Sequence, residues 1–455
     1  MRNFTIIGGG FSGTSTAISL LRHARGPARI SIINAEYPLA RGSAYSTTKP
    51  EHILNVPVRM MSAVAEEPRH FLEWLRSRDE FCAVPEAELQ EQYMQRRLFG
   101  EYLGQTLDES RRQAAPGVEF DAIDGEAVAI KTDESGPHVI LSDGRRAPSD
   151  RILLALGNRP PPALPFGGPT FVHPRYIANP WHPWEDRLPA HHEPIVLIGA
   201  GLTMIDAFLT LQERDWKGPI YTVSRSALLP MSYFPPVEFP DYLPPDPTRL
   251  KLRELVILME AHCIHARRRG IPTPVVVDKL RPYTQQIFRQ FTPEEKRAFV
   301  QNHRQRWGAA RHRIPAHIHE RVIGAIHDGR LIVVKAAVKR MEPTESGIRV
   351  VVEDEGRVTE IAAGMVLNCT GPQESCTRDP SPLLSDLLSQ GLIQADDVDL
   401  GVRASANYAV IGKDGAASKW LFAIGPMLRG SLWETVAVPE IREQASAIAQ
   451  TMLGD

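Results

Sequence analysis

The stretch FTIIGGGFSGTSTAISLL (residues 4–21) decides the fold expected for this chain. Phe4–Ile7 is a short apolar run that suits a buried parallel strand. The glycines that follow, Gly8, Gly10 and Gly13, fit the pattern G-x-G-x-x-G. In such a turn the first glycine permits a tight bend, the second lets a phosphate approach the backbone, and the third lets helix and strand pack closely. The pattern predicts a turn that binds a dinucleotide.

The residues beyond this turn complete a strand–helix–strand unit. A helix is expected over about Gly13–His23, with its first N–H groups directed toward a pyrophosphate. A second strand is expected over Arg29–Asn34, and Glu36 follows it. A carboxylate at this place can accept hydrogen bonds from an adenosine ribose. The unit therefore predicts FAD or NAD, and the alternative is a glycine-rich turn without a ligand.

Composition limits the class of protein. The chain has 455 residues, of which 43% are hydrophobic and 23% charged, and these values predict an ordinary globular protein of two or three domains. A net charge of −2 implies no attraction to nucleic acid or to an anionic membrane. No run of 18 apolar residues occurs, and the first strand is expected almost at residue 1, so we expect neither a membrane span nor a signal peptide. The four cysteines form no C-x-x-C pair, so we expect a cytoplasmic protein without a metal site.

A second unit of the same kind begins at EPIVLIGAGLTMIDAFLTL (193–211). Gly199 and Gly201 repeat the turn, while Met204 occupies the place of the third glycine. The next strand, GPIYTVSR, ends in Arg225 without an acidic residue. An arginine there can pair with the 2′-phosphate of NADPH, so NADPH is favoured over NADH. The alternative is that Arg225 is an ordinary solvated arginine. The residues expected at this site are Gly199, Gly201, Leu202, Thr203 and Arg225.

The remaining segments fill in the architecture. Residues 37–66 are expected to form a long loop, which in a compact domain is usually functional. Helices are expected over 67–115 and short strands over 118–142. Two apolar strands end in glycine, at Gly157 and at Gly371, where the backbone could pass close to a cofactor. A helical insertion is expected over about 240–325, with examples at 249–270 and 292–313, the latter opening on the capping box Thr292–Glu295.

The fold class that follows is α/β, with two Rossmann-like dinucleotide-binding domains, a three-layer FAD domain and an NAD(P) domain, and a helical insertion. The expected domains are residues 1–185 as the first part of the FAD domain, 186–345 as the NAD(P) domain with its insertion, and 346–455 as the second part of the FAD domain.

At this level of detail the chain resembles the two-dinucleotide-binding-domain flavoproteins, and among them a bacterial family of FAD/NAD(P)-binding proteins similar to flavin-dependent N-hydroxylases and other class B monooxygenases. The stretches that carry the resemblance are GGGFSGT (8–14), GSAYST (42–47), LNVPVRMMSA (54–63), HFLEWL (70–75), GAGLTMID (199–206), LNCTGP (367–372) and IGPMLRGSLWETVAVPEIR (424–442).

The resemblance implies that FAD is the tightly held cofactor. Many relatives carry Asp directly after the glycine that corresponds to Gly425, whereas this chain has Pro426. Trp433, Glu434 and Thr435 are expected to start the closing helix, whose dipole would favour negative charge on reduced flavin; core packing is the alternative for Trp433. The residues expected to contact FAD are Gly8, Gly10, Phe11, Ser12, Gly13, Glu36, Arg41, Asn55, Val56, Met61, Gly157, Gly371, Gly425, Trp433, Glu434 and Thr435.

Another family pattern fits less well. Class B monooxygenases carry F-x-G-x-x-x-H and then an aromatic residue between their nucleotide units. Here Phe166, Gly168 and His173 place the histidine one residue late, with Tyr176 and Trp181 as the nearest aromatics. The segment is either a linker that senses NADPH or a proline-rich crossover.

Two dinucleotides on one chain have an obvious use, because one can pass a hydride to the other. We therefore expect an FAD-dependent NAD(P)H oxidoreductase of the monooxygenase type, whose reduced flavin reacts with oxygen and oxidises a small molecule. The alternatives are a flavin reductase that passes electrons to a quinone or protein carrier, and a flavin-bound sensor or assembly protein without turnover. The loop 37–63 lacks the cysteines that a disulfide reductase needs. No catalytic side chain is assigned.

Overall fold

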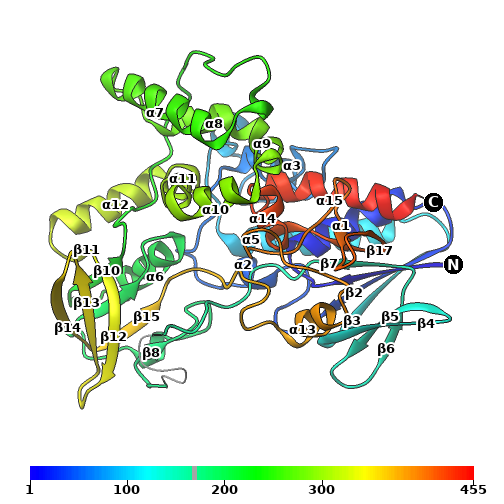
Figure 1. The fold of residues 1–455 in the computed structure, drawn as a ribbon, viewed down its shortest axis with the longest axis horizontal. Coiled ribbons are helices and arrows are strands. Elements are labelled where there is room, and N and C mark those ends of the chain that lie inside the picture. Colours follow the sequence, from blue (N-terminus) through cyan, green and yellow to red (C-terminus); the bar gives the residue numbers. More distant parts are fainter. Residues whose placement is uncertain (166–171, 455) are drawn as a thin grey trace.

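The computed structural model describes residues 1–165 and 172–454, and these form two parallel sheets joined side by side beneath a layer of helices (Figure 1). The first sheet has the strand order β16-β17-β7-β1-β2-β3 and is parallel except for the pairing of β16 with β17. Its strands are β1 (Arg2–Ile7), β2 (Ala28–Asn34), β3 (Val118–Asp124), β7 (Arg151–Leu154), β16 (Ala409–Ile411) and β17 (Ala417–Ala423).

The first sheet takes strands from both ends of the chain. Helices α1 (Phe11–His23) and α15 (Val438–Leu453) pack against each other on one of its faces. The side chains of Ile18, Leu21, Ile448 and Met452 are fully buried in the same core. The Arg2 guanidinium also donates to the carbonyl of Leu453 (2.9 Å). The C-terminal elements β16, β17 and α15 thus complete the sheet and the helix layer that begin at the N-terminus.

Helices and a small sheet cover the rest of this domain. Helix α5 (Arg96–Arg112) packs beside α1, and the antiparallel strands β4 to β6 lie at the other face near α13. These smaller elements are α2 (Gly42–Tyr45), α3 (His70–Arg76), α4 (Glu86–Leu89), β4 (Ala127–Asp133), β5 (Gly136–Leu141), β6 (Arg146–Pro148) and α13 (Pro382–Ser389). The expected loop 37–66 contains α2 and a single 3₁₀ turn at Val58–Met60, and otherwise has no helix or strand.

The second sheet is parallel and has the order β11-β10-β9-β15-β8. Its strands are β8 (Tyr176–Ile177), β9 (Ile195–Ile198), β10 (Ile220–Ser224), β11 (Leu331–Lys335) and β15 (Met365–Asn368). Helices α6 (Leu202–Glu213) and α12 (Ala316–His327) pack on one side of it, and the antiparallel sheet of β12 (Ala337–Pro343), β13 (Ile348–Asp354) and β14 (Arg357–Ala363) packs on the other.

The boundary expected at residues 345 and 346 falls between β12 and β13, inside one antiparallel sheet. The chain remains with the second sheet until Asn368, because β15 inserts between β9 and β8. The second part of the first domain therefore begins only after β15. The short strand β8 also precedes the expected start of the second domain at residue 186.

The helical insertion projects from the molecule above both sheets (Figure 1). Its helices are α7 (Leu252–Arg268), α8 (Pro274–Leu280), α9 (Thr284–Gln290), α10 (Pro293–Asn302) and α11 (Arg304–Arg311). The capping box is confirmed, since Thr292 accepts from the N–H of Glu295 and Glu295 accepts from the N–H of Thr292. The helical stretch expected over 292–313 is divided at His303, which separates α10 from α11.

The expectation that the closing helix starts at Trp433 is wrong. Trp433 ends the short helix α14 (Arg429–Leu432) with a φ of 66°, a left-handed conformation that interrupts the helix. The closing helix α15 starts at Val438, with Pro439 in its first turn, where a proline is tolerated because its missing N–H is not needed. Trp433, Glu434 and Thr435 therefore lie in the connection between α14 and α15.

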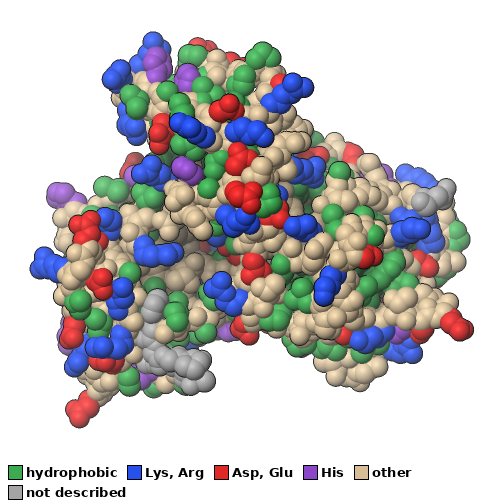
Figure 2. Space-filling view, viewed as in Figure 1, with side chains coloured by type: hydrophobic (Ala, Val, Ile, Leu, Met, Phe, Trp, Pro, Cys, Tyr) green, Lys and Arg blue, Asp and Glu red, His purple; other side chains and the backbone are tan. Residues whose placement is uncertain are grey.

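None of the described helices is both long and apolar enough to cross a membrane. On the face shown in Figure 2, acidic and basic side chains are intermixed over most elements. That distribution agrees with the near-zero net charge.

Candidate functional site

The first glycine turn connects β1 to α1 and has the geometry that the spacing predicts. Gly8 has a φ of 111°, and a Cβ added to it would lie 2.2 Å from the carbonyl oxygen of Ala155. A Cβ on Gly13 would lie 2.0 Å from the carbonyl oxygen of Gly8. A side chain is thus excluded at Gly8 by the backbone that follows β7, and at Gly13 by the close approach of α1 to the turn.

Gly10 is different, because its Cβ would meet only the Cα of Gly42, at 3.5 Å. Gly10 is the N-cap of α1, and no side chain caps the helix or places an acidic group in its first turn. The first N–H groups of a helix lack intrahelical partners and can bind an anion. The fold therefore has room for a side chain at Gly10, and the glycine leaves that space open to a phosphate.

The segment that follows β2 forms hydrogen bonds to the glycine turn. The side-chain oxygen of Asn34 accepts from the N–H of Gly9 (3.2 Å), and the carbonyl of Gly9 accepts from the N–H of Ala40 (2.8 Å). Glu36 is exposed just beyond β2, with its carboxylate 3.1 Å from Nε2 of His182. Its place fits the predicted ribose contact. His182 is a neighbour that sequence reasoning missed, since 146 residues separate the two.

Gly425 lies beside the same helix terminus. Its φ is 70°, and an added Cβ would lie 2.9 Å from Oγ of Ser12. The N–H of Gly425 donates to the side-chain oxygen of Gln444 (3.1 Å), and its carbonyl accepts from the hydroxyl of Thr435 (3.0 Å). Gln444 and Thr435 are thus the polar side chains at the position where many relatives carry Asp and this chain has Pro426.

The loop residues expected near the flavin divide into two groups. Arg41 and Asn55 are half-buried, and their side chains have no hydrogen-bond partner among the residues that the structure describes. Val56 and Met61 are buried in the first core, where their side chains serve packing. Phe11 is buried too, and its ring packs against the rings of Tyr45 and Phe99 at centroid distances of 6.4 and 5.8 Å.

Trp433 and Glu434 contact the helical insertion. The Trp433 ring lies 4.7 Å from that of Phe299 and 5.4 Å from that of Phe288. The Glu434 carboxylate accepts from the indole N–H of Trp307 (2.8 Å) and pairs with Arg311 (3.2 Å). Core packing, the alternative considered for Trp433, is therefore what the structure shows for this side chain.

The second glycine turn connects β9 to α6. Gly199 has a φ of 116°, and an added Cβ would lie 2.3 Å from the carbonyl oxygen of Cys369. Gly201 is the N-cap of α6, has no atom within 4 Å of an added Cβ, and leaves the helix without a side-chain cap. Leu202 and Thr203 form the start of the helix. The second turn thus offers the same exposed N–H groups as the first.

Arg225 follows directly after β10, beside this turn. Its side chain is exposed, and within residues 1–165 and 172–454 it has neither an ion-pair partner nor a hydrogen-bond partner. An unpaired guanidinium at this place suits a 2′-phosphate.

Gly157 and Gly371, which end two apolar strands, lie on the two segments by which the chain crosses between the sheets. Gly157 and Gly371 have φ values of 61° and 91°, and no atom lies within 4 Å of an added Cβ on either. Arg159 pairs with Gln373 in an antiparallel bridge, and the N–H of Gln373 donates to the carbonyl of Pro160 (3.1 Å). The chain therefore crosses between the two sheets as a pair of adjacent segments.

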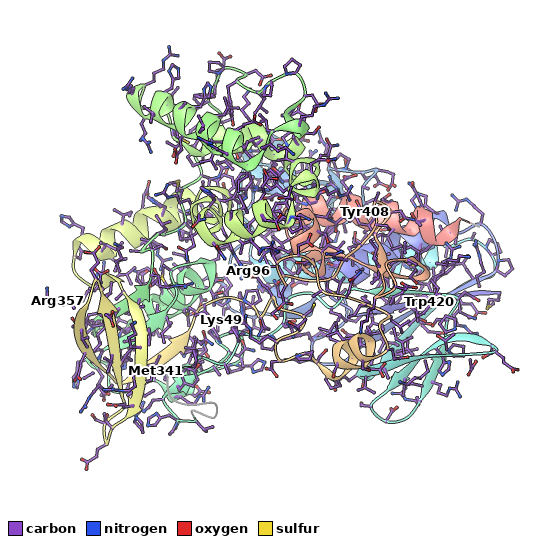
Figure 3. All side chains as sticks on the ribbon, in the orientation of Figure 1. Lys49, Arg96, Met341, Arg357, Tyr408 and Trp420 are labelled. Carbon is purple, nitrogen blue, oxygen red and sulfur yellow. The ribbon has the colours of Figure 1, made fainter. Side chains whose placement is uncertain are left out.

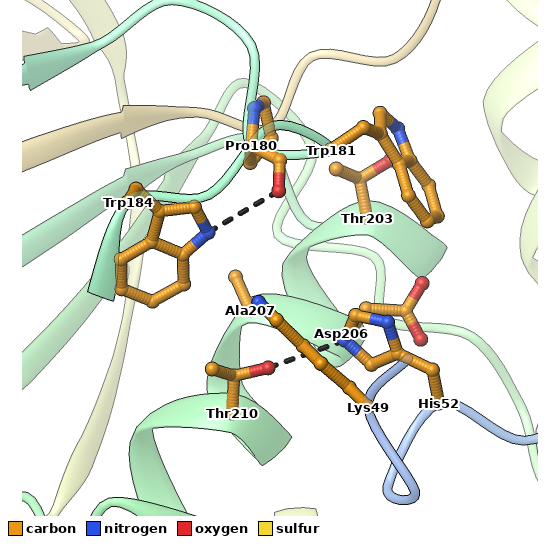
Figure 4. A pocket seen from close by; sticks show the side chains of 9 residues that line it. All are labelled: Lys49, His52, Pro180, Trp181, Trp184, Thr203, Asp206, Ala207 and Thr210. Carbon is orange, nitrogen blue, oxygen red and sulfur yellow. Dashed lines mark hydrogen bonds between the residues drawn. The ribbon is translucent and has the colours of Figure 1, made fainter. Parts of the chain in front are cut away.

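A buried polar seam joins the first domain to α6 (Figure 4). We use the term domain seam for the side chains of Lys49, His52, Arg96, Glu185, Asp206 and Thr210. Arg96 on α5 and Asp206 on α6 form an ion pair at 3.0 Å with side chains only 12% and 11% exposed. Lys49 pairs with Glu185, and Figure 3 places Lys49 and Arg96 near the junction of the two halves.

His52 is the titratable centre of the domain seam. Its Nδ1 lies 2.9 Å from the hydroxyl of Thr47, and its Nε2 lies 3.2 Å from the hydroxyl of Thr210. Burial, and then the charges of Arg96 and Lys49, lower the pKa of His52 to about 4. The imidazole is therefore neutral at physiological pH. No sequence motif marks the residues of the domain seam, since they come from four segments that only the fold brings together.

The buried cysteines and the remaining sequence patterns add no reactive group to the site. Cys369 is buried, and burial raises the pKa of its thiol. Cys376 is buried, and its thiol donates a hydrogen bond to the carbonyl of Gly401 (3.1 Å). Burial raises the pKa of the Cys376 thiol to about 12. Among the described side chains there is no group of three or more potential metal ligands. Phe166 and Gly168 of the monooxygenase-like pattern lie outside the described residues, whereas Trp181 lines the pocket at the domain seam.

The comparisons with known proteins agree with this geometry. Residues 5–159 match a family model described as FAD-NAD(P)-binding. No curated protein matches the sequence. The structure is similar to reduced ornithine hydroxylase from Pseudomonas aeruginosa, with a TM-score of 0.68 and 15% identity over 100% of this chain and 99% of that one.

Two further solved structures are similar over the same length. An ornithine N-hydroxylase from Kutzneria sp. 744, solved with reduced FAD, NADP⁺ and L-ornithine, has a TM-score of 0.65 and 14% identity over 99% of both chains. An L-lysine 6-monooxygenase from Pseudomonas syringae has a TM-score of 0.65 and 18% identity over 99% of this chain and 98% of that one. The chain has the fold of the two-dinucleotide-binding-domain flavoproteins, so the recognised fold class is confirmed.

Proposed function

We propose that this protein is an FAD-dependent NADPH oxidoreductase of the monooxygenase type, which oxidises a small molecule with reduced flavin and oxygen. The observation that carries the proposal is the pair of uncapped glycine turns, one before α1 and one before α6, on two parallel sheets of one chain. Parallel α/β sheets bind ligands at the carboxyl ends of their strands, and both turns lie at such ends. The fold shared with N-hydroxylases supports the same assignment.

In this proposal FAD occupies the first turn. The N–H groups at the start of α1 hold its pyrophosphate, Glu36 holds the adenosine ribose, and Gly425 lies along the arm between phosphate and flavin ring. Arg41 and Asn55 offer the free polar side chains of the loop that faces the ring. FAD accepts a hydride and, when reduced, reacts with oxygen.

NADPH occupies the second turn, with its pyrophosphate at the start of α6 and its 2′-phosphate at Arg225. The seam residues Arg96 and Asp206 hold α6 against α5 and so fix the distance between the two turns. A cytoplasmic location also belongs to this proposal, since NADPH and a reduced set of free thiols suit that compartment.

The test is anaerobic reduction of the purified FAD-loaded protein by NADPH, followed by addition of oxygen with recording of the flavin spectrum. We expect NADPH to bleach the flavin absorbance, and we expect oxygen to restore it faster when the correct small molecule is present. Incorporation of an atom from labelled oxygen gas into that molecule would establish the monooxygenase assignment.

Two results would contradict the proposal. If neither NADPH nor NADH reduces the flavin, the protein would instead be a flavin-bound protein without catalytic turnover. Rapid transfer of electrons to quinones, with no labelled oxygen in any product, would indicate a reductase that acts on an electron carrier.

A further inference from the structure

Three segments that are distant in sequence meet at Glu374. This residue follows the Gly371 turn after β15, while Arg429 opens α14 just after Gly425 and Arg304 opens α11 of the insertion. One carboxylate oxygen of Glu374 pairs with Arg429, and the other pairs with Arg304. The side chains of Glu374, Arg429 and Arg304 are 15%, 17% and 33% exposed, so the group is largely buried but reachable from solvent through Arg304.

The group has more positive than negative charge, since two guanidiniums share one carboxylate. Two further carboxylates of this region already have cationic partners: Glu434 pairs with Arg311 (3.2 Å), and Glu440 pairs with Arg281 (2.7 Å) and Arg311 (3.2 Å). His312 lies beside these arginines, and burial together with Arg429 and Arg311 lowers its pKa to about 3, so it adds no charge. Leaving a largely buried cation unpaired is costly. Two guanidiniums and one carboxylate carry one unit of net positive charge, which a bound monoanion would balance.

The two guanidiniums also have donors to spare. A guanidinium carries five N–H groups, and within the described chain Arg304 and Arg429 each donate one side-chain hydrogen bond, to Glu374. Both lie over the ring of Trp433, at 5.9 and 6.0 Å from its centroid. Phe288 and Phe299 pack against the Trp433 ring, so both guanidiniums lie over an aromatic ring that is fixed by its neighbours.

The position suits a substrate. Arg429 is four residues beyond Gly425, which touches the start of α1, and Glu374 is three residues beyond Gly371, at the end of β15. The group therefore lies between the carboxyl ends of both sheets, with the insertion above it. We propose that Arg304 and Arg429 bind the carboxylate of an organic-acid substrate. This inference rests on the proposed function and names the substrate class. A single carboxylate balances the excess charge, whereas a doubly charged phosphate would exceed it.

The test is calorimetric titration of the FAD-loaded protein, without NADPH, using hexanoate and phenylacetate and their neutral amides. We expect the carboxylates to bind and the amides not to bind. Arg304→Gln and Arg429→Gln should each weaken carboxylate binding about tenfold, the usual scale for a charge-assisted hydrogen bond. Arg306→Gln is the matched control, because Arg306 lies exposed on the same helix and should leave binding unchanged.

Glu374→Gln should change the affinity for carboxylates in the opposite direction. A misfolded protein would not bind more tightly, so this variant separates a specific effect from loss of folding. It removes the carboxylate that competes with the ligand, and we expect it to tighten binding severalfold. The inference is overturned if neither carboxylate binds the wild-type protein, if the amides bind equally well, or if Glu374→Gln weakens binding. Because no NADPH is present, these results are separate from the redox test: a protein that binds carboxylates in this pattern but is not reduced by NADPH would refute the proposed function alone.

Discussion

Gly10 and Gly13 belong to the same turn, but glycine is needed at the two positions for different reasons. At Gly13 an added Cβ would lie 2.0 Å from a backbone carbonyl, so the residue is needed for packing. At Gly10 the backbone has a φ of −79°, which any residue adopts, and an added Cβ makes only an ordinary contact. The fold does not require a glycine at position 10, whereas a bound phosphate would.

This distinction predicts the effect of Gly10→Ala. The variant should fold with an unchanged Tm in the absence of FAD, because its methyl group has room. Its affinity for FAD should fall about tenfold or more, since the methyl group occupies the approach to the pyrophosphate. Titration of the apoprotein with FAD measures this. Gly26→Ala, where no atom lies within 4 Å of the added Cβ, is the matched control. Equal FAD affinity in both variants would contradict the assignment of the turn.

Arg225 supplies a second prediction at the residue scale. Arg225→Ala should raise the Kd for NADPH about tenfold and change that for NADH less than about twofold, because only NADPH carries the 2′-phosphate. Arg357→Ala is the control, since Arg357 is an exposed arginine on β14 at the far edge of the same half (Figure 3). An equal loss for both nucleotides would reject a phosphate-binding role for Arg225.

At the scale of elements, the domain seam is the contact that sets α5 against α6. It combines the Arg96–Asp206 ion pair with a neutral His52 that both domains hydrogen-bond. Removing one partner of a largely buried ion pair costs about 3–5 kcal/mol, so either charge alone would destabilise the contact. The seam therefore binds the two nucleotide-binding halves more firmly than surface charges could.

His52 makes the stability of this contact depend on pH. Its pKa is about 4 in the folded protein and 6.5 as its ordinary value, so the unfolded chain takes up the proton first as the pH falls. Stability is fully present above about pH 6.5 and declines toward pH 4, by about 3 kcal/mol in all. Measurements of Tm across this range should show a shallower decline for His52→Gln than for the wild type. Parallel curves would mean that His52 does not titrate as its burial implies.

At the scale of the whole molecule, the first domain is discontinuous. Its sheet and its helix layer combine residues 1–154 with residues 409–453, and the second domain is inserted between them. Helix α15 supplies buried side chains to the core around α1, and Gln444 on it contacts Gly425 at the glycine turn. Neither end of the chain can build the first dinucleotide site alone.

Deletion of residues 438–455 tests this arrangement. We expect the truncated protein to be insoluble or to retain no FAD, because the deletion exposes the apolar face of α1 and removes Gln444. Deletion of residues 454–455 alone, which follow α15, should leave FAD content unchanged. The yellow colour of the purified protein, expressed as flavin absorbance per protein, is the measurement. A truncated protein with full FAD content would show that α15 is dispensable.

Local spacing in the sequence determined many of the strands, the glycine turns, the capping box and the fold class, because each depends on residues within a few positions of one another. It did not predict the short strands β8 and β16. The tertiary structure decided what sequence separation hides. It placed β15 between β9 and β8 and so moved the domain boundary, and the backbone conformation of Trp433 moved the start of the closing helix. It also joined Arg96 to Asp206, 110 residues apart, and Glu374 to Arg429, 55 apart. These residue pairs come into contact only when the two sheets and their helices pack together, so no local sequence motif predicts them.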